Sequence, residues 1–101
     1  LRRLYQDRRD RVVSALREMG WPIRPPGGAI YVWVPVPPGF DSLGFATLLL
    51  DRTGVVVTPG NGYGQQGEGF VRISLTVPDW RLDEAMRRWK ERGPTFHPSS
   101  H

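Results

Sequence analysis

Apolar residues recur every three or four positions along residues 1–19, and this spacing predicts an amphipathic helix. Gly20 should end the helix, because glycine favours helix ends and Pro22 follows two residues later. No capping residue precedes Leu1, so we expect this helix to be cut from a longer one. The apolar positions are Leu1, Leu4, Tyr5, Val12, Leu16 and Met19.

A second helical pattern covers residues 79–92. Asp79 follows Pro78 and is the expected N-cap, while Gly93 and Pro94 should end the helix. Its apolar face repeats at the helical spacing and consists of Leu82, Ala85, Met86 and Trp89.

Three shorter segments are typical of β-strands. Ala29–Val34 is rich in β-branched and aromatic residues and should be a strand buried on both faces. Val55–Thr58 should be a second strand. Phe70–Leu75 alternates, so it should place Val71, Ile73 and Leu75 on one side and Phe70, Arg72 and Ser74 on the other.

The segments between these strands differ in character. Asp41 or Ser42 can cap a short helix that ends at Gly54. Pro59–Gly69 contains five glycines, too many for a helix or a strand, and should be a loop. The apolar face of the short helix consists of Phe45, Leu48 and Leu49.

The order helix, strand, helix, strand, strand, helix predicts an α/β fold. We expect a two-layer sandwich in which a small sheet of three or four strands carries helices mainly on one face. Phe70, Arg72 and one side of Ala29–Val34 would then face away from the helices, with no element left to cover them. A second body should lie against that face.

Composition and charge narrow the function classes. The 101 residues fit one domain, and the absence of cysteine excludes disulfides, thiolate metal sites and cysteine nucleophiles. The net charge is +4, and the arginines of the first helix are interleaved with acids, a pattern typical of a solvated face. No stretch is apolar enough to span a membrane, and a cytoplasmic location is expected.

Candidate catalytic groups are few. The run Gly62–Gly67 fits the dinucleotide fingerprint, but a strand follows it rather than a helix, which favours a turn that passes close to another surface. His97 and His101 lie in a segment without pattern. Lys90 should be an exposed cation in the last turn of a helix rather than a Schiff-base lysine. We therefore expect no catalytic residue and no metal ligand in this chain.

Arg72 is the charged residue that best fits a binding role. It lies in the middle of a predicted strand between Phe70 and Ser74, where a guanidinium needs a planar acceptor such as a carboxylate or a phosphate. Two other interpretations stay open at this point: an arginine that faces solvent, or one that pairs with Glu68.

Several motifs carry a family resemblance over residues 1–93. The motifs, in order, are YQDRRD at Tyr5–Asp10, PGGAIYVW at Pro26–Trp33, GVVVTPGNGYG at Gly54–Gly64, GEGFVRISL at Gly67–Leu75 and LDEA at Leu82–Ala85. With these motifs, the sequence resembles the C-terminal small domain of fold-type I aminotransferases, which use pyridoxal phosphate. The runs VPPG and FATLLL look especially like bacterial LL-diaminopimelate or aspartate aminotransferases.

The resemblance implies a role for one residue. The family's arginine in this strand binds the substrate's α-carboxylate, and Arg72 occupies its position. Ile30 lies where it could touch the substrate side chain, although a core role is favoured. The family's Schiff-base lysine and its other pyridoxal phosphate ligands belong to the large domain, and no stretch here matches them. The resemblance thus implies a homodimeric parent enzyme that acts on an amino acid and a 2-oxo acid, and an inactive isolated chain.

Two other functions compete with this interpretation. A free-standing basic module would bind single-stranded nucleic acid through exposed Tyr31, Trp33 and Phe70 together with the first helix. A purely structural domain would not need Arg72 at all. Residues 94–101 lack any pattern and should be a disordered tail or an expression remnant.

Overall fold

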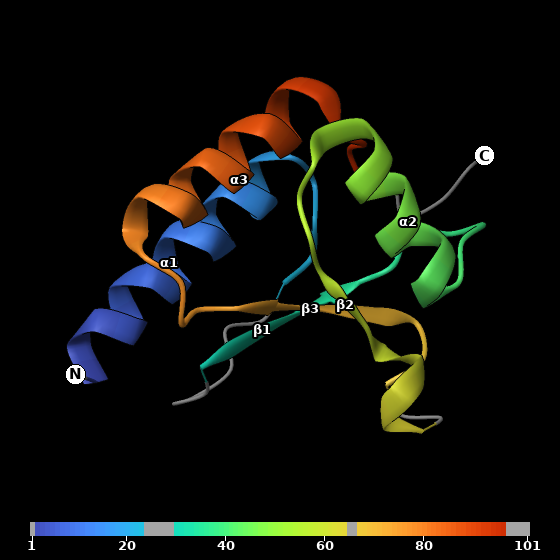
Figure 1. The fold of residues 1–101 in the computed structure, drawn as a ribbon, viewed down its shortest axis with the longest axis horizontal. Coiled ribbons are helices and arrows are strands. Elements are labelled where there is room, and N and C mark those ends of the chain that lie inside the picture. Colours follow the sequence, from blue (N-terminus) through green and yellow to red (C-terminus); the bar gives the residue numbers. More distant parts are fainter. Residues whose placement is uncertain (1, 24–29, 65–66, 97–101) are drawn as a thin grey trace.

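The computed structural model describes residues 2–23, 30–64 and 67–96. Within them, three helices lie on one side of a three-stranded sheet (Figure 1). This arrangement confirms the expected two-layer α/β sandwich. The elements are α1 (Arg2–Glu18), β1 (Tyr31–Pro35), α2 (Ser42–Thr53), β2 (Thr58–Pro59), the 3-10 helix η1 (Gly60–Tyr63), β3 (Phe70–Ser74) and α3 (Asp79–Arg92).

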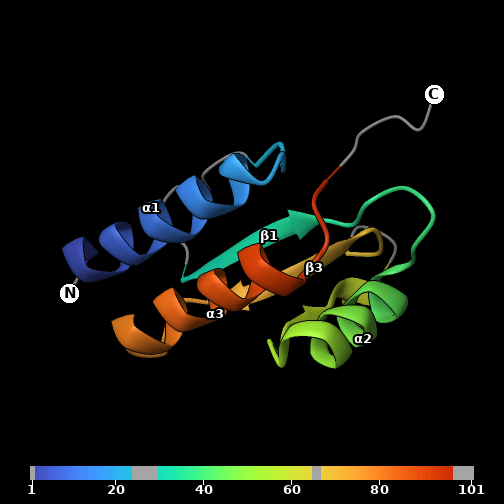
Figure 2. The same ribbon diagram turned by 90° about the horizontal axis from the view of Figure 1, so that it is seen from above.

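The sheet is antiparallel, in the order β1-β3-β2. Arg72 therefore lies in the central strand, opposite Trp33 of β1 on one side and Thr58 of β2 on the other. The helices α1, α3 and α2 lie side by side across one face of this sheet (Figure 2).

β2 is shorter than the predicted strand Val55–Thr58, and that prediction is wrong in extent. Val55 and Val57 are buried whereas Val56 is 79% exposed, so this stretch alternates like a strand. Only Thr58 and Pro59 pair with β3, however. Alternating burial of side chains shows that one side of a segment packs on the core. It does not require the backbone of that segment to be hydrogen-bonded to a neighbouring strand.

β1 also departs from expectation. The prediction of a strand buried on both faces is wrong, because Val32 and Val34 are buried while Tyr31 and Trp33 are only half-buried. The helices cover one face of the sheet, and the two aromatic residues lie on the other. Ala29, the expected first residue of this strand, lies outside the described residues.

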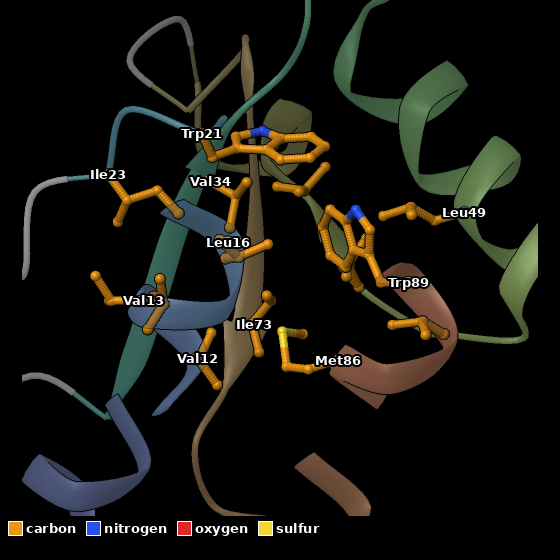
Figure 3. Close-up of a cluster of buried hydrophobic side chains, with 14 of the residues drawn as sticks. Val12, Val13, Leu16, Trp21, Ile23, Val34, Leu49, Ile73, Met86 and Trp89 are labelled. Carbon is orange, nitrogen blue, oxygen red and sulfur yellow. The ribbon is translucent and has the colours of Figure 1, made fainter. Parts of the chain in front are cut away.

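The core fills the space between the helices and the inner face of the sheet. Trp21 and Trp89 meet edge to face, with ring centroids 5.1 Å apart, and Phe45 packs against both (Figure 3). The indole N–H of Trp21 donates a hydrogen bond to the carbonyl oxygen of Pro35 at 2.8 Å. The buried faces of α2 and α3 thus match the apolar positions expected from their spacing.

The first turn of α3 differs from its predicted cap. Pro78 is the N-cap and Asp79 is the first helical residue, so the prediction of an Asp79 cap is wrong. The Asp79 carboxylate accepts a hydrogen bond from Arg8 Nε at 2.8 Å, and Arg8 also donates to the carbonyl oxygen of Leu75 at 2.9 Å. Asp79 therefore joins α3 to α1 instead of capping its own helix.

Residues 94–96, the first part of the expected tail, contact the core. The backbone N–H of Phe96 donates to the carbonyl oxygen of Met19 at 3.0 Å, and the Phe96 ring lies 5.6 Å from that of Trp21. The remaining expected tail, residues 97–101, lies outside the described part.

Candidate functional site

Arg72 projects from the face of the sheet that the helices do not cover. Its neighbours in β3, Val71 and Ile73, are buried against the helices, whereas Arg72 and Ser74 are half-buried. This is the alternation that the sequence predicts. Arg72 therefore stands at the centre of an outer face that remains partly open to solvent.

Tyr31 supports the Arg72 side chain. The guanidinium carbon of Arg72 lies 3.9 Å from the centroid of the Tyr31 ring, well within the range of a cation–π interaction. Tyr31 and Trp33 come from β1, next to β3, and point to the same side of the sheet. We define these two residues with Phe70, Arg72 and Ser74 as the outer-face cluster.

Such a cluster suits a small planar anion. A guanidinium offers N–H groups in a fork that matches the two oxygens of a carboxylate. Half-buried aromatic neighbours strengthen that interaction because they displace water from around it. Phe70 is partly exposed and borders the arginine along the same strand.

Glu68 stabilises the start of β3 through hydrogen bonds within the chain. Its carboxylate accepts hydrogen bonds from the Ser42 backbone N–H at 2.9 Å, the Ser42 hydroxyl at 3.0 Å and the Gly69 N–H at 2.9 Å. The Ser42 backbone hydrogen bond is the main reason that the pKa of Glu68 lies below its ordinary value. Sequence reasoning considered Glu68 only as a partner of Arg72, although the option of Ser42 as a helix-capping residue was a signal for this contact.

The glycine-rich segment is a turn that passes close to its own chain. A Cβ atom at Gly60 would overlap the carbonyl oxygen of Gly67 and would lie 2.8 Å from that of Phe70. η1 is followed by β3 and not by the long helix that a dinucleotide site requires. The following strand agrees with the preference for a turn over a dinucleotide loop, but the close approach is at Gly60 and to the chain's own backbone, and an approach to another surface stays a prediction. Gln65 and Gln66, within that motif, lie outside the described residues.

The other candidate residues do not join Arg72. Lys90 lies on α3 with its side chain 68% exposed, and its Nζ is 3.5 Å from Glu18 Oε1. Ile30 is half-buried just before β1, and its carbonyl oxygen accepts the Leu75 N–H at 2.8 Å. His97 and His101 fall outside the described residues.

The part of the chain that the structure describes contains neither a cluster of metal ligands nor a membrane-spanning helix. No three histidine, cysteine or acidic side chains gather there as a metal site would require. No helix within the same residues is long and apolar enough to cross a lipid bilayer.

The arginines of α1 are largely engaged within the protein. Arg8 pairs with Asp79 and Arg11 with Asp83, and Arg17 donates to the carbonyl oxygen of Ile23. Tyr31 and Trp33, which a nucleic-acid module would expose, are half-buried. The ion pairs of Arg8 and Arg11 weaken the positive electrostatic field that a nucleic-acid-binding module needs.

The sequence model of the family described as "Aminotransferase class I and II" matches residues 1–88. The chain belongs to this aminotransferase family. The family expected from the motifs is thus confirmed, and with it the fold-type I class.

Individual relatives agree with the family. The chain is 56% identical over 90 residues to LL-diaminopimelate aminotransferase 2 of Nostoc sp.. The matched residues make up 89% of this chain and 23% of that protein. Among solved structures, it is similar to L,L-diaminopimelate aminotransferase from Chlamydomonas reinhardtii, with a TM-score of 0.81 and 37% identity over 88% of this chain and 22% of that one. An aromatic aminotransferase from Pyrococcus horikoshii gives a TM-score of 0.81 at 39% identity, over 88% of this chain and 25% of that one.

The chain therefore spans about a quarter of the length of the aminotransferases it matches. In these solved structures the matched part belongs to a longer chain, and a second body against the outer face of the sheet stays a prediction.

Proposed function

We propose that this chain works as the substrate-carboxylate-binding small domain of an aminotransferase, with residues 1–93 forming that domain. Arg72 would bind the α-carboxylate of the amino acid and of the 2-oxo acid. The observation that carries the proposal is the position of the Arg72 guanidinium, 3.9 Å from the Tyr31 ring centroid on the uncovered face of the sheet.

The chemistry of the guanidinium supports this role. Two parallel N–H donors fix a carboxylate in orientation as well as in position, which a single ammonium group does not do. An amino-group transfer requires the substrate's α-carbon to be held in one orientation toward the reacting groups. Arg72 would supply that orientation, and closure of the small domain over the substrate would exclude water.

The residues of this chain do not fit pyridoxal phosphate. Lys90 is the single lysine of the sequence, and it lies on α3 beside Glu18 of α1, in the helical layer. Arg72 lies on the opposite face of the sheet. The cofactor that the family generally uses would be held by residues outside these 101, and it would supply the group that carries the amino nitrogen.

The substrate class follows from the family and the relatives. An amino acid and a 2-oxo acid are the proposed substrates, and LL-diaminopimelate is the first amino acid to test, because the relative at 56% identity is named for it. A homodimeric whole enzyme and a cytoplasmic location belong to the same proposal.

A binding experiment tests the role of Arg72. In the full-length aminotransferase that contains these residues, Arg72→Lys should raise the Kd of 2-oxoglutarate roughly 30-fold or more by calorimetry, as expected when one partner of a buried charge pair is altered. Arg11→Lys, on the exposed side of α1, is the matched control and should leave the Kd unchanged. An unchanged Kd in Arg72→Lys would remove Arg72 from the site.

The nucleic-acid alternative has a separate test. Filter binding of single-stranded RNA by the 101-residue chain should be weak at low salt and without a steep salt dependence. Tight binding that falls steeply as salt is raised would favour the alternative.

A further inference from the structure

Glu68 connects two segments that are far apart in the sequence. Ser42, at the start of α2, and Glu68, just before β3, are 26 positions apart. One carboxylate oxygen of Glu68 accepts the Ser42 hydroxyl, and the other accepts the backbone N–H groups of Ser42 and Gly69. Hydrogen bonds to a charged acceptor are about twice as strong as those between neutral groups, so this contact is a firm connection.

A second hydrogen bond closes a ring around this connection. The backbone N–H of Val36, just after β1, donates to the carbonyl oxygen of Gly69 at 2.8 Å. The loop from β1 to α2 is thus held at both of its ends to the pair Glu68–Gly69. This loop and the entry to β3 lie side by side (Figure 2).

The entry to β3 decides which way Arg72 points. Gly69 has a φ of +94°, a conformation that lets the chain turn sharply into the strand. Side chains alternate along a strand, so a slip of one residue at the entry would turn Arg72 toward the helices. Burial of Val71 and Ile73 keeps Arg72 on the outer face, and the residue that fixes this entry fixes how precisely the start of the strand, and with it the guanidinium, is placed there.

We infer that Glu68 is a positioning residue for Arg72: by binding Ser42 and Gly69, it holds the start of β3 in the register that presents the guanidinium to the substrate carboxylate. This inference rests on the proposed function, because it needs a substrate at Arg72. Glu68 itself touches no substrate in this account.

Glu68→Gln removes the negative charge of the acceptor with little change in shape. The amide oxygen can still accept the two backbone N–H groups while the NH2 group donates to the Ser42 hydroxyl, so weaker neutral hydrogen bonds replace the charge-assisted ones. The substitution should loosen the entry to β3 and leave the core intact.

Asp41→Ala is the matched control, because it removes the helix cap. Asp41 caps the same helix by accepting the Gly44 N–H at 2.7 Å, and the N-cap hydrogen bond joins two residues of that helix end. A loss of helix capping alone would therefore affect both variants, whereas a loss of Arg72 positioning would affect only Glu68→Gln.

The experiment is a double-mutant cycle on the full-length aminotransferase, with the Kd of 2-oxoglutarate measured by calorimetry. Glu68→Gln should weaken binding about 2- to 30-fold, the range found for residues that act through a coupled neighbour. In the Arg72→Lys background, Glu68→Gln should have little further effect. Amide hydrogen exchange at Gly69 in the 101-residue chain should accelerate in Glu68→Gln and stay unchanged in Asp41→Ala.

The outcomes separate the two proposals. If Arg72→Lys alone leaves the Kd unchanged, the proposed function fails. If Arg72→Lys weakens binding but Glu68→Gln does not, or weakens it equally in both backgrounds, the role of Glu68 fails. An equal loss in Asp41→Ala would assign the effect to helix capping and would also overturn the inference.

Discussion

The Arg72 guanidinium carbon lies 3.9 Å from the centroid of the Tyr31 ring, on the face of the sheet opposite the helices. The two residues come from neighbouring antiparallel strands, and Tyr31 lies opposite Ser74, two positions along β3 from Arg72. This diagonal pairing places an aromatic surface beneath a long cation. Under the proposed function, the ring would help to pre-organise the arginine and so lower the entropic cost of binding a carboxylate.

Tyr31→Leu should weaken substrate binding because it removes the ring under Arg72 while keeping an apolar side chain. A cation–π contact at a partly exposed site contributes about 0.5–1 kcal/mol, so KM for the amino acid should rise by roughly two- to fivefold. Tyr31→Phe keeps the ring and is the control. Steady-state kinetics on the full-length aminotransferase provides the comparison, and equal KM values for the two variants would argue against the ring's role.

Arg8→Ala should destabilise the chain by about 1.5–3 kcal/mol, because it breaks charge-assisted hydrogen bonds of a side chain that is only 12% exposed. The matched control is Arg11→Ala, which breaks the pair with Asp83 between the same two helices. Arg11 is 50% exposed, so its loss should cost no more than about 1 kcal/mol. Denaturant unfolding of the three proteins measures both effects, and equal losses would contradict the assigned burial.

Gly60→Ala should destabilise the chain by about 1–3 kcal/mol, because its Cβ would overlap the carbonyl oxygen of Gly67, which is backbone and cannot simply rotate away. Gly62→Ala, in the same short helix, has open space around its Cβ and should be neutral. Neither glycine has a positive φ, so the pair isolates the steric effect. Thermal unfolding distinguishes the two variants, and a tolerated Gly60→Ala would show that the turn does not need this close approach.

The stabilising effect of Glu68 should depend on pH. The hydrogen bonds from Ser42 lower the pKa of Glu68 in the folded chain below its ordinary value of 4.5. The folded state therefore favours the charged carboxylate, and the stability that this adds is fully present above pH 4.5 and is lost as the pH falls through the lowered pKa. The difference in unfolding midpoint between the wild type and Glu68→Gln should be constant near neutral pH and should shrink in acid. A difference that grows in acid would contradict this account.

Local pattern was enough to predict the helices and the direction of Arg72. The spacing of Leu82, Met86 and Trp89 set the buried face of α3, and the alternation along Phe70–Leu75 set the side on which Arg72 lies. Both depend on residues close in sequence. The shared side of Tyr31 and Trp33 was also implicit in their spacing within β1.

Contacts between distant segments could not be predicted in this way. Asp79 looked like a helix cap from its neighbours, but Arg8, 71 positions away, takes its carboxylate. Glu68 looked like a partner for Arg72, four residues along, yet it binds Ser42. In each case a charged side chain had a plausible local partner, and the fold brought a better-placed donor from another element.

The contact of residues 94–96 with the core could not be predicted for a related reason. Phe96 follows a proline and belongs to no periodic pattern, so its sequence gives no sign of the Trp21 ring against which it packs. A single aromatic residue packs on a core because its shape fits there, and a search for periodic apolar positions does not find it.

The most direct measurement compares two substrates on one variant. For Arg72→Lys in the full-length aminotransferase, kcat/KM should be measured with an amino acid and with the matching amine that lacks the α-carboxylate, alongside a titration of the cofactor. Loss of the two-pronged contact should lower kcat/KM for the amino acid by about 2–4 kcal/mol in transition-state binding, or roughly 30- to 1000-fold, and should leave the amine and cofactor binding unchanged. A near-normal kcat/KM for the amino acid, an equal loss for the amine, or a loss explained by cofactor dissociation would contradict the assignment of Arg72 to the substrate carboxylate.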